Sequence, residues 1–201
     1  MSSPLTDLLR ARRMVRAYAP DPLTDAEVDH LVWAARRAPS AGNAQGTELL
    51  VLAGPAQTSR YWDATLPAER RATFRWPDLL IAPLLIIPCA RASTYVARYG
   101  EDDKAATGLG RGEDHWAVPY WHVDAGMAAM AVLLAAQDLG LGALLFGLFD
   151  QEAAVKATFA IPDDVQPVAT IAVGRPRPDD PGRSTARPRR PDDEVVHRGG
   201  W

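Results

Sequence analysis

The stretch RRAPSAGNAQGTELLVL, residues 36–52, passes from the end of a helix to the start of a strand. The preceding helix is expected to stop at Pro39, because proline lacks the backbone N–H and disfavours a helical residue before it. The apolar run at 48–53 then predicts a strand. Between them stand small and polar residues: Ser40, Gly42, Asn43, Gln45 and Gly46. Such a loop is either an ordinary connection or a surface of backbone and amide groups that holds a polar ligand.

The helix before this loop has a clear start. Thr24 and Glu27 have the spacing of a capping box, in which each side chain bonds the other residue's backbone N–H. Apolar residues then recur at helical spacing up to the stop at Pro39. Later in the chain, Asp150 is expected to cap a helix that reaches Phe159.

Strands are predicted by apolar runs at 48–53, 82–90, 143–147 and 166–174. The first two runs are continuously apolar, which indicates that both faces of their sheet are covered. Because these strands are interspersed with helices, the sequence predicts an α+β fold of three layers, α-β-α. We expect a single domain over residues 1–201, ending in an extended tail rich in Pro, Arg and Asp after residue 174.

The longest apolar segment, AGMAAMAVLLAA at 125–136, belongs to a predicted helix over 121–139. It is shorter than the roughly 20 residues that span a bilayer. The helix is apolar on nearly every side, so we expect it to pack on its own sheet and on a second copy of the chain.

Composition excludes several classes of function. The chain has 201 residues, 47% of them hydrophobic and 23% charged, with a net charge of −3. This balance gives no general electrostatic attraction to nucleic acid. The N-terminal segment lacks the apolar stretch of a signal peptide, and no membrane association is expected. The one cysteine, Cys89, lies in an apolar run and is expected to be a buried thiol, as suits the cytoplasm.

Side chains arranged for catalysis are not evident. GLGRG at 108–112 lacks the Lys-Ser/Thr of a P-loop, and GLGALLFG at 140–147 leads from helix to strand, the reverse of a dinucleotide-binding turn. The four histidines are scattered without metal-ligand spacing, and no serine stands in a G-x-S-x-G motif. The sequence therefore predicts no metal site and no catalytic side chain, so a cofactor would carry the chemistry of an enzyme.

Four segments, in order, resemble the FMN-dependent nitroreductase family. RRMVR at 12–16 is similar to the family's R-R-S-x-R motif, and APSAGNAQGT at 38–47 is similar to A-P-S-x-x-N-x-Q-P-W. The segment 124–150 resembles the family's long central helix and the strand that follows it. The tail RPRRPDDEVV at 187–196 resembles K/R-x-R-x-P-hydrophobic-E-x-V, beginning at Arg187.

The resemblance implies a homodimer with one FMN at each of two sites across the interface. Residues carried over to the phosphate and ribityl side are Arg12, Arg13, Met14, Arg16, Arg187 and Arg189. The partner subunit would contribute Pro39, Ser40 and Asn43 to the flavin, and the backbone at Gly147 and Leu148 would approach the ring. Met14 stands where the family has Ser, which removes a hydroxyl. Gly46-Thr47 stands where the family has Pro-Trp, which is expected to loosen the loop.

The function implied by the resemblance is transfer of electrons from NAD(P)H to a nitroaromatic, a quinone or a similar small acceptor, by a ping-pong mechanism. Two alternatives remain open: an FMN-dependent dehydrogenase or reductive dehalogenase, and a flavin-binding protein that stores FMN without turnover. The sequence does not distinguish NADH from NADPH. Trp116, Tyr120 and Trp121 are either a lid over the substrate face or part of the core.

Overall fold

The computed structural model describes residues 3–178 and 186–201. Within them, five strands form one antiparallel sheet in the order β1–β2–β5–β3, and β4 also pairs with β2. The strands are β1 (Thr47–Ala53), β2 (Leu84–Ala90), β3 (Gly142–Phe146), β4 (Gln166–Pro167) and β5 (Thr170–Gly174). The run at 166–174 therefore makes two short strands where the sequence predicts one.

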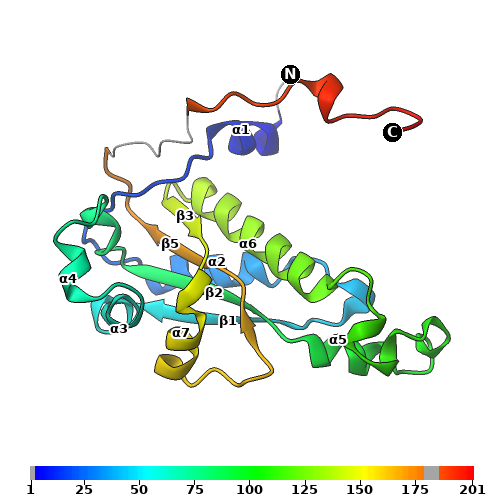
Figure 1. Cartoon of the computed structure of the whole chain (residues 1–201). Helices are drawn as coiled ribbons and strands as arrows, with labels where there is room; N and C mark the ends of the chain where they lie inside the picture. The colour runs from blue at the N-terminus through cyan, green and yellow to red at the C-terminus, as the bar shows by residue number, and fades with distance from the viewer. Residues whose placement is uncertain (1–2, 179–185) are drawn as a thin grey trace.

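Helices cover both faces of this sheet (Figure 1). They are α1 (Pro4–Ala11), α2 (Asp25–Ala35), α3 (Pro55–Thr65), α4 (Ala68–Arg71), α5 (Ala92–Tyr99), α6 (Tyr120–Asp138) and α7 (Glu152–Phe159). One buried cluster joins α2 and α6 to the sheet, and a second joins α3 and α7 to the opposite face. The predicted α+β fold, with a sheet between two helical layers, is confirmed.

The central strand β2 determines this layering. All seven of its residues are buried. Leu84 and Ile86 belong to the cluster beneath α2 and α6, whereas Leu85 and Ile87 belong to the cluster beneath α3 and α7. This alternation is the period of two expected of a strand whose neighbouring side chains point to opposite faces. Cys89 is buried as predicted, and burial raises the pKa of its thiol to about 11.

The long helix α6 buries one side against the sheet and α2. Ala125, Val132 and Ala136 are fully buried on that side. The other side exposes large apolar residues: Tyr120, Val123, Met127 and Met130. Among the described helices, none is long and apolar enough to cross a membrane.

The N-terminal segment after α1 runs along the edge of β3. Met14 forms a parallel bridge with Ala143, and the Val15 N–H donates to the Ala143 carbonyl at 3.0 Å. The buried Tyr18 hydroxyl donates to the Val15 carbonyl at 2.7 Å and to the Ala172 carbonyl at 3.1 Å. These bonds place the arginine-rich segment 12–16 beside the strand that ends at Gly147.

The sequence missed the helices α3 and α4 and misplaced one cap. Helix α3 (PAQTSRYWDAT) was not predicted, because its apolar positions lack a continuous helical stripe. The expectation that Asp150 caps α7 is wrong. A 3₁₀ turn (Phe149–Gln151) precedes that helix, and Gln151 is its N-cap without a side-chain bond.

The start of α2 is as predicted, with one further partner. The Thr24 N–H donates to Glu27 at 2.8 Å, and the Glu27 N–H donates to the Thr24 hydroxyl at 3.3 Å. Arg175, at the end of β5, binds both carboxylate oxygens of Glu27, at 2.6 and 2.9 Å. These contacts, with Arg175 the strongest, lower the pKa of Glu27 to about 2.

This pair makes stability depend on pH. Because the pKa of Glu27 is lower in the folded chain than its usual 4.5, its contribution is complete above about pH 4.5 and disappears as pH falls towards 2. We expect Glu27→Gln to lower the free energy of unfolding by about 1 kcal/mol at pH 7 and to have little effect near pH 2. Denaturant titrations at both pH values measure this. The exposed Glu69→Gln is the control, and a Glu27→Gln effect that does not change with pH contradicts the prediction.

Candidate functional site

A pocket of about 440 Å³ lies where the end of β3 meets α3 and the segment before β2. Its volume falls in the range of small-molecule sites. We call it the aromatic pocket, since its lining includes Trp62, Phe74, Trp76 and Phe146. Among the described residues that line it, the arginines and carboxylates are Arg16, Arg70 and Asp150.

The rings of the pocket form an ordered wall. Trp62 stacks on Phe146 with ring centroids 5.9 Å apart and planes inclined by 11°. The guanidinium of Arg16 lies 5.3 Å from the centre of the Trp76 ring, and Phe74 meets Trp76 edge to face. A planar aromatic ligand suits such a wall, because offset or edge-on ring contacts and cations over rings are favourable.

Three buried side-chain donors have no acceptor within the described residues, and two of them belong to residues that line the aromatic pocket. They are Nη1 of Arg12 and the indole N–H groups of Trp62 and Trp76. Each unsatisfied buried donor costs about 1–3 kcal/mol. Both tryptophans line the aromatic pocket, and Arg12 lies four residues before Arg16, which also lines it. The site thus fits a ligand that is rich in acceptors, as FMN is through its phosphate and ring carbonyls.

The structure brings some of the predicted cofactor residues together at this pocket. Arg16, Gly147 and Leu148 line it, although Arg16 and Gly147 are far apart in sequence. The Met14 side chain is partly buried against both core clusters, and its carbonyl accepts from Arg16 at 3.1 Å. Arg13 is exposed and donates to the carbonyls of the neighbouring Arg10 and Arg12.

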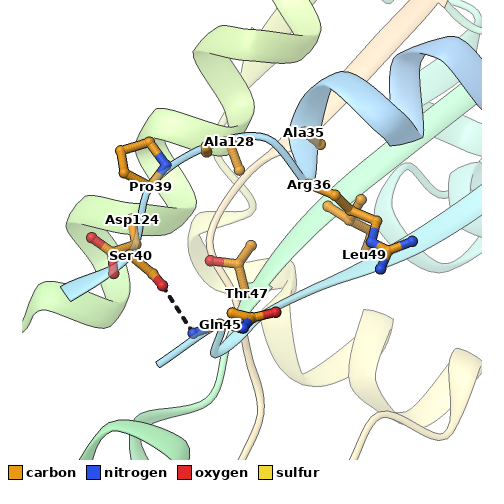
Figure 2. Close-up of a pocket in the computed structure, with 10 residues that line it drawn as sticks. Ala35, Arg36, Pro39, Ser40, Gln45, Thr47, Leu49, Asp124 and Ala128 are labelled. Carbon is orange, nitrogen blue, oxygen red and sulfur yellow. Dashed lines mark hydrogen bonds between the residues drawn. The ribbon is translucent and has the colours of Figure 1, made fainter. Parts of the chain in front are cut away.

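Pro39 and Ser40 line a different pocket of about 180 Å³, between the loop after α2, the start of β1 and α6. Gln45, Thr47, Asp124 and Ala128 also line this loop pocket (Figure 2). The Ser40 hydroxyl accepts from the Gln45 N–H at 2.9 Å, so the side chain of Ser40 closes the loop upon itself. Asn43 is exposed in the same loop.

The loop has an unusual backbone. Gly42, Asn43 and Gln45 all have left-handed conformations, with φ near +60°. Arg98 of α5 donates to the Gly42 carbonyl at 2.9 Å, and the same guanidinium binds Asp103 through both carboxylate oxygens. A strained loop therefore rests on fixed partners from α5.

Gly46 explains one departure from the family motif. A Cβ at this position would lie 2.3 Å from the ring of Tyr95, and the buried Gly46 carbonyl accepts from the Arg91 N–H. Only a residue without a side chain permits this approach. The expected loosening of the loop by Gly46-Thr47 is therefore not found, because the glycine allows close packing against α5.

Arg187 and Arg189 are exposed, and no contact with Arg12 is found among the described residues. The end of the chain and its start lie on the same side of the molecule (Figure 1). The meeting of the two predicted arginine groups at one phosphate stays a prediction.

The aromatic residues 116–121 belong mainly to the core. Trp116 and Trp121 are each 8% exposed and pack around the buried Tyr95, and the Trp116 indole N–H donates to the Leu109 carbonyl at 3.0 Å. Tyr120 is 44% exposed. The core alternative therefore describes Trp116 and Trp121, and neither residue is a lid.

Sequence reasoning missed the tryptophans of the aromatic pocket and the buried Asp124. Trp62 lies on α3, which was not predicted, and Trp76 lies in an irregular segment. A polar residue in the apolar helix α6 was the available signal for Asp124, which is only 2% exposed.

The geometry thus describes a three-layer α+β protein with a pocket of small-molecule size beside an arginine-rich segment. The family model described as "Nitroreductase family" matches residues 9–175. The chain belongs to the nitroreductase family, and the predicted family resemblance is confirmed.

Individual relatives agree with this membership. A 5,6-dimethylbenzimidazole synthase of Rhodobacter capsulatus is 30% identical over 200 residues, covering 98% of this chain and 90% of that protein. An FMN-dependent nitroreductase of Clostridium difficile superposes with a TM-score of 0.67 at 19% identity, covering 96% of this chain and 98% of that one. The NfrA1 nitroreductase of Bacillus subtilis has a TM-score of 0.74 at 21% identity, covering 97% of this chain and 74% of that one.

The close packing at Gly46 leads to a prediction. We expect Gly46→Ala to lower the free energy of unfolding by about 1–3 kcal/mol, because the added methyl group must displace the Tyr95 ring or the loop. Gly200→Ala is the control, since a Cβ there meets no other atom of the chain within 4 Å. Thermal and denaturant unfolding of both variants measure the difference. If Gly46→Ala is as stable as the parent chain, the loop accommodates the added methyl group and the prediction is contradicted.

Proposed function

We propose that the protein is an FMN-dependent oxidoreductase that transfers electrons from NAD(P)H to a nitroaromatic, a quinone or a similar small acceptor. The observation that carries the proposal is the set of three buried donors without acceptors, at Arg12, Trp62 and Trp76. Membership of the nitroreductase family and the FMN-dependent relative in Clostridium difficile support the same cofactor.

Each part of the pocket has a proposed task. Arg12 and Arg16 bind the phosphate, since a guanidinium can donate to two phosphate oxygens at once. Trp62 and Trp76 offer ring surfaces and N–H donors to the flavin, and the backbone at Gly147 approaches its ring. Bound FMN would supply the two-electron redox chemistry. The protein then needs no positioned acid or base, and the charged residues of the lining include only one carboxylate, the exposed Asp150.

We further propose that the enzyme is a homodimer. In one chain, Pro39 and Ser40 line the loop pocket while Arg16 and Gly147 line the aromatic pocket, so the two predicted groups do not share a site. A second copy packed on the exposed apolar side of α6 supplies the missing group to each flavin. The tail with Arg187 and Arg189 completes the phosphate site in the dimer.

The proposed reaction has two half-reactions in a ping-pong mechanism. NAD(P)H gives up its hydride and leaves as NAD(P)⁺, and the acceptor then enters the same cavity. Shared use of one cavity explains why the chain carries no separate dinucleotide-binding motif. The buried free thiol of Cys89 suits a cytoplasmic location.

A second candidate function is formation of 5,6-dimethylbenzimidazole. Its support is the identity of 30%, over nearly the whole chain, to the synthase of Rhodobacter capsulatus. The product of that enzyme is a defined small molecule, so the two candidates are separable by product analysis.

Anaerobic mixing of the flavin-loaded protein with NADH or NADPH tests the main proposal. We expect rapid bleaching of the oxidised-flavin absorbance, followed by recovery when a quinone or nitroaromatic is added. No bleaching with either nucleotide contradicts the reductase and favours the alternatives, an FMN-dependent dehydrogenase or reductive dehalogenase and a flavin-storage protein. Mass spectrometry of the reaction mixtures reveals 5,6-dimethylbenzimidazole if the second candidate is correct.

The phosphate site gives a quantitative prediction. Removing a hydrogen bond to a charged group costs about 1.5–3 kcal/mol, so Arg12→Ala and Arg189→Ala should each weaken FMN binding by about 10- to 100-fold. Riboflavin lacks the phosphate and should bind all variants with nearly the same affinity. Fluorescence quenching with both flavins measures this, and Arg60→Ala, on the outer side of α3, is the control. Unchanged FMN affinity in Arg189→Ala would remove the tail from the cofactor site.

A further inference from the structure

We propose that Asp124 is a positioning residue for the loop 39–46: its buried carboxylate, on α6, holds this loop in the conformation that presents Pro39, Ser40 and Asn43 to the flavin of the partner subunit. The inference rests on the proposed function for the role of the loop. The contacts that hold the loop are independent of any cofactor.

The contacts of Asp124 converge on one oxygen. Oδ2 accepts from the Ala41 N–H at 2.8 Å and from the Tyr95 hydroxyl at 2.7 Å. Ala41 is the first residue of the short 3₁₀ turn in the loop, and Tyr95 is the residue whose ring covers Gly46. One carboxylate oxygen therefore joins the loop, α5 and α6.

Burial of this carboxylate requires a specific use. Asp124 is 2% exposed on a helix whose neighbouring buried positions, such as Ala125 and Ala128, carry alanine. Its Oδ1 has no partner within the described residues. Burying a charged or polar group without full hydrogen bonding costs free energy, a cost that the neighbouring buried alanines do not carry. What the aspartate provides in return is the pair of hydrogen bonds that its Oδ2 accepts from Ala41 and Tyr95.

The loop depends on external support. Asn43 and Gln45 are non-glycine residues with φ near +56°, a conformation that L-residues adopt at a cost. Such conformations persist where the surrounding structure determines them. Asp124 fixes the start of the turn through Ala41, and Arg98 fixes its middle through Gly42. Without Asp124, the start of the turn loses its bond to α6.

Asp124 also links this loop to the exposed side of α6. Val123 precedes it and is 41% exposed, and Met127 lies one turn later and is 36% exposed. In the proposed dimer these two residues face the partner. In the proposed dimer, the helix that contacts the partner is then the same helix that sets the position of the loop offered to the partner's flavin.

Two substitutions separate positioning from packing and charge. Asp124→Ala removes both hydrogen bonds, while Asp124→Asn keeps an acceptor oxygen of nearly the same shape. The first readout is the rate of trypsin cleavage after the exposed Arg36 and Arg37, just before the loop. Cleavage after Arg70 and Arg71, in α4, is the internal standard. The second readout is FMN affinity, measured by fluorescence quenching of the whole protein.

We expect Asp124→Ala to be cleaved before the loop several-fold faster than the parent chain, with an unchanged rate in α4. Its FMN affinity should fall by about tenfold or more. Asp124→Asn should stay within about threefold of the parent in both measurements, because the amide oxygen accepts the same two bonds. Trp116→Phe is the matched control, since it removes the hydrogen bond to the Leu109 carbonyl from the same cluster and leaves both hydrogen bonds of Asp124 in place.

Defined outcomes overturn the inference. Parent-like cleavage in Asp124→Ala shows that the loop is held without Asp124. Equal losses in Asp124→Asn and Asp124→Ala show that charge, and not an acceptor at Oδ2, is what matters. If Asp124→Ala fails to fold, the single variant Tyr95→Phe takes its place and is compared with Asp124→Asn. Tyr95→Phe must then be cleaved before the loop faster than the parent chain. Absence of FMN binding by the parent chain refutes the proposed function, while the cleavage comparison still tests the inference.

Discussion

The strand Leu84–Ala90 has no charged side chain and is buried along its whole length, and the architecture follows from this constraint. Its two faces require two apolar layers, which α2 and α6 provide on one side and α3 and α7 on the other. β5 then pairs with one edge of this strand and β3 with β5, which leaves the outer edge of β3 for the segment that carries Arg12 and Arg16. Burial of one strand thus determines where the arginines stand relative to Gly147.

The parts of the fold that could be predicted are those in which local chemistry and tertiary packing agree. Thr24 and Glu27 define a helix start within four residues, and the apolar runs leave no alternative to buried strands. Helix α3 was not predicted, because its buried residues include the polar Thr58 beside Tyr61 and Trp62 and do not form a continuous apolar stripe. Asp150 failed as a cap because a 3₁₀ turn moved the start of α7 beyond it.

The candidate site likewise contains some residues that could be predicted from the sequence and others that could not. The motif residues Arg16, Gly147 and Leu148 could be named from the sequence, because they belong to recognisable segments, and the structure brings them to one pocket. Trp62 and Trp76 could not, because an indole becomes a candidate donor only when tertiary packing buries its N–H without an acceptor. The sequence predicts that Gly46 loosens the loop, whereas in the structure Gly46 packs closely against the ring of Tyr95.

The distribution of unsatisfied groups supports a site that is shared between two chains. Within the described residues, the buried unpaired side-chain atoms comprise three donors, at Arg12, Trp62 and Trp76, and one acceptor, at Asp124. The two tryptophans line the aromatic pocket, whereas the acceptor belongs to the loop pocket on α6. A single chain therefore separates the surface that binds an acceptor-rich ligand from the loop that would cover it. In the proposed dimer, packing through α6 would bring the loop of one chain to the pocket of the other, and cofactor binding and subunit association would then stabilise one another.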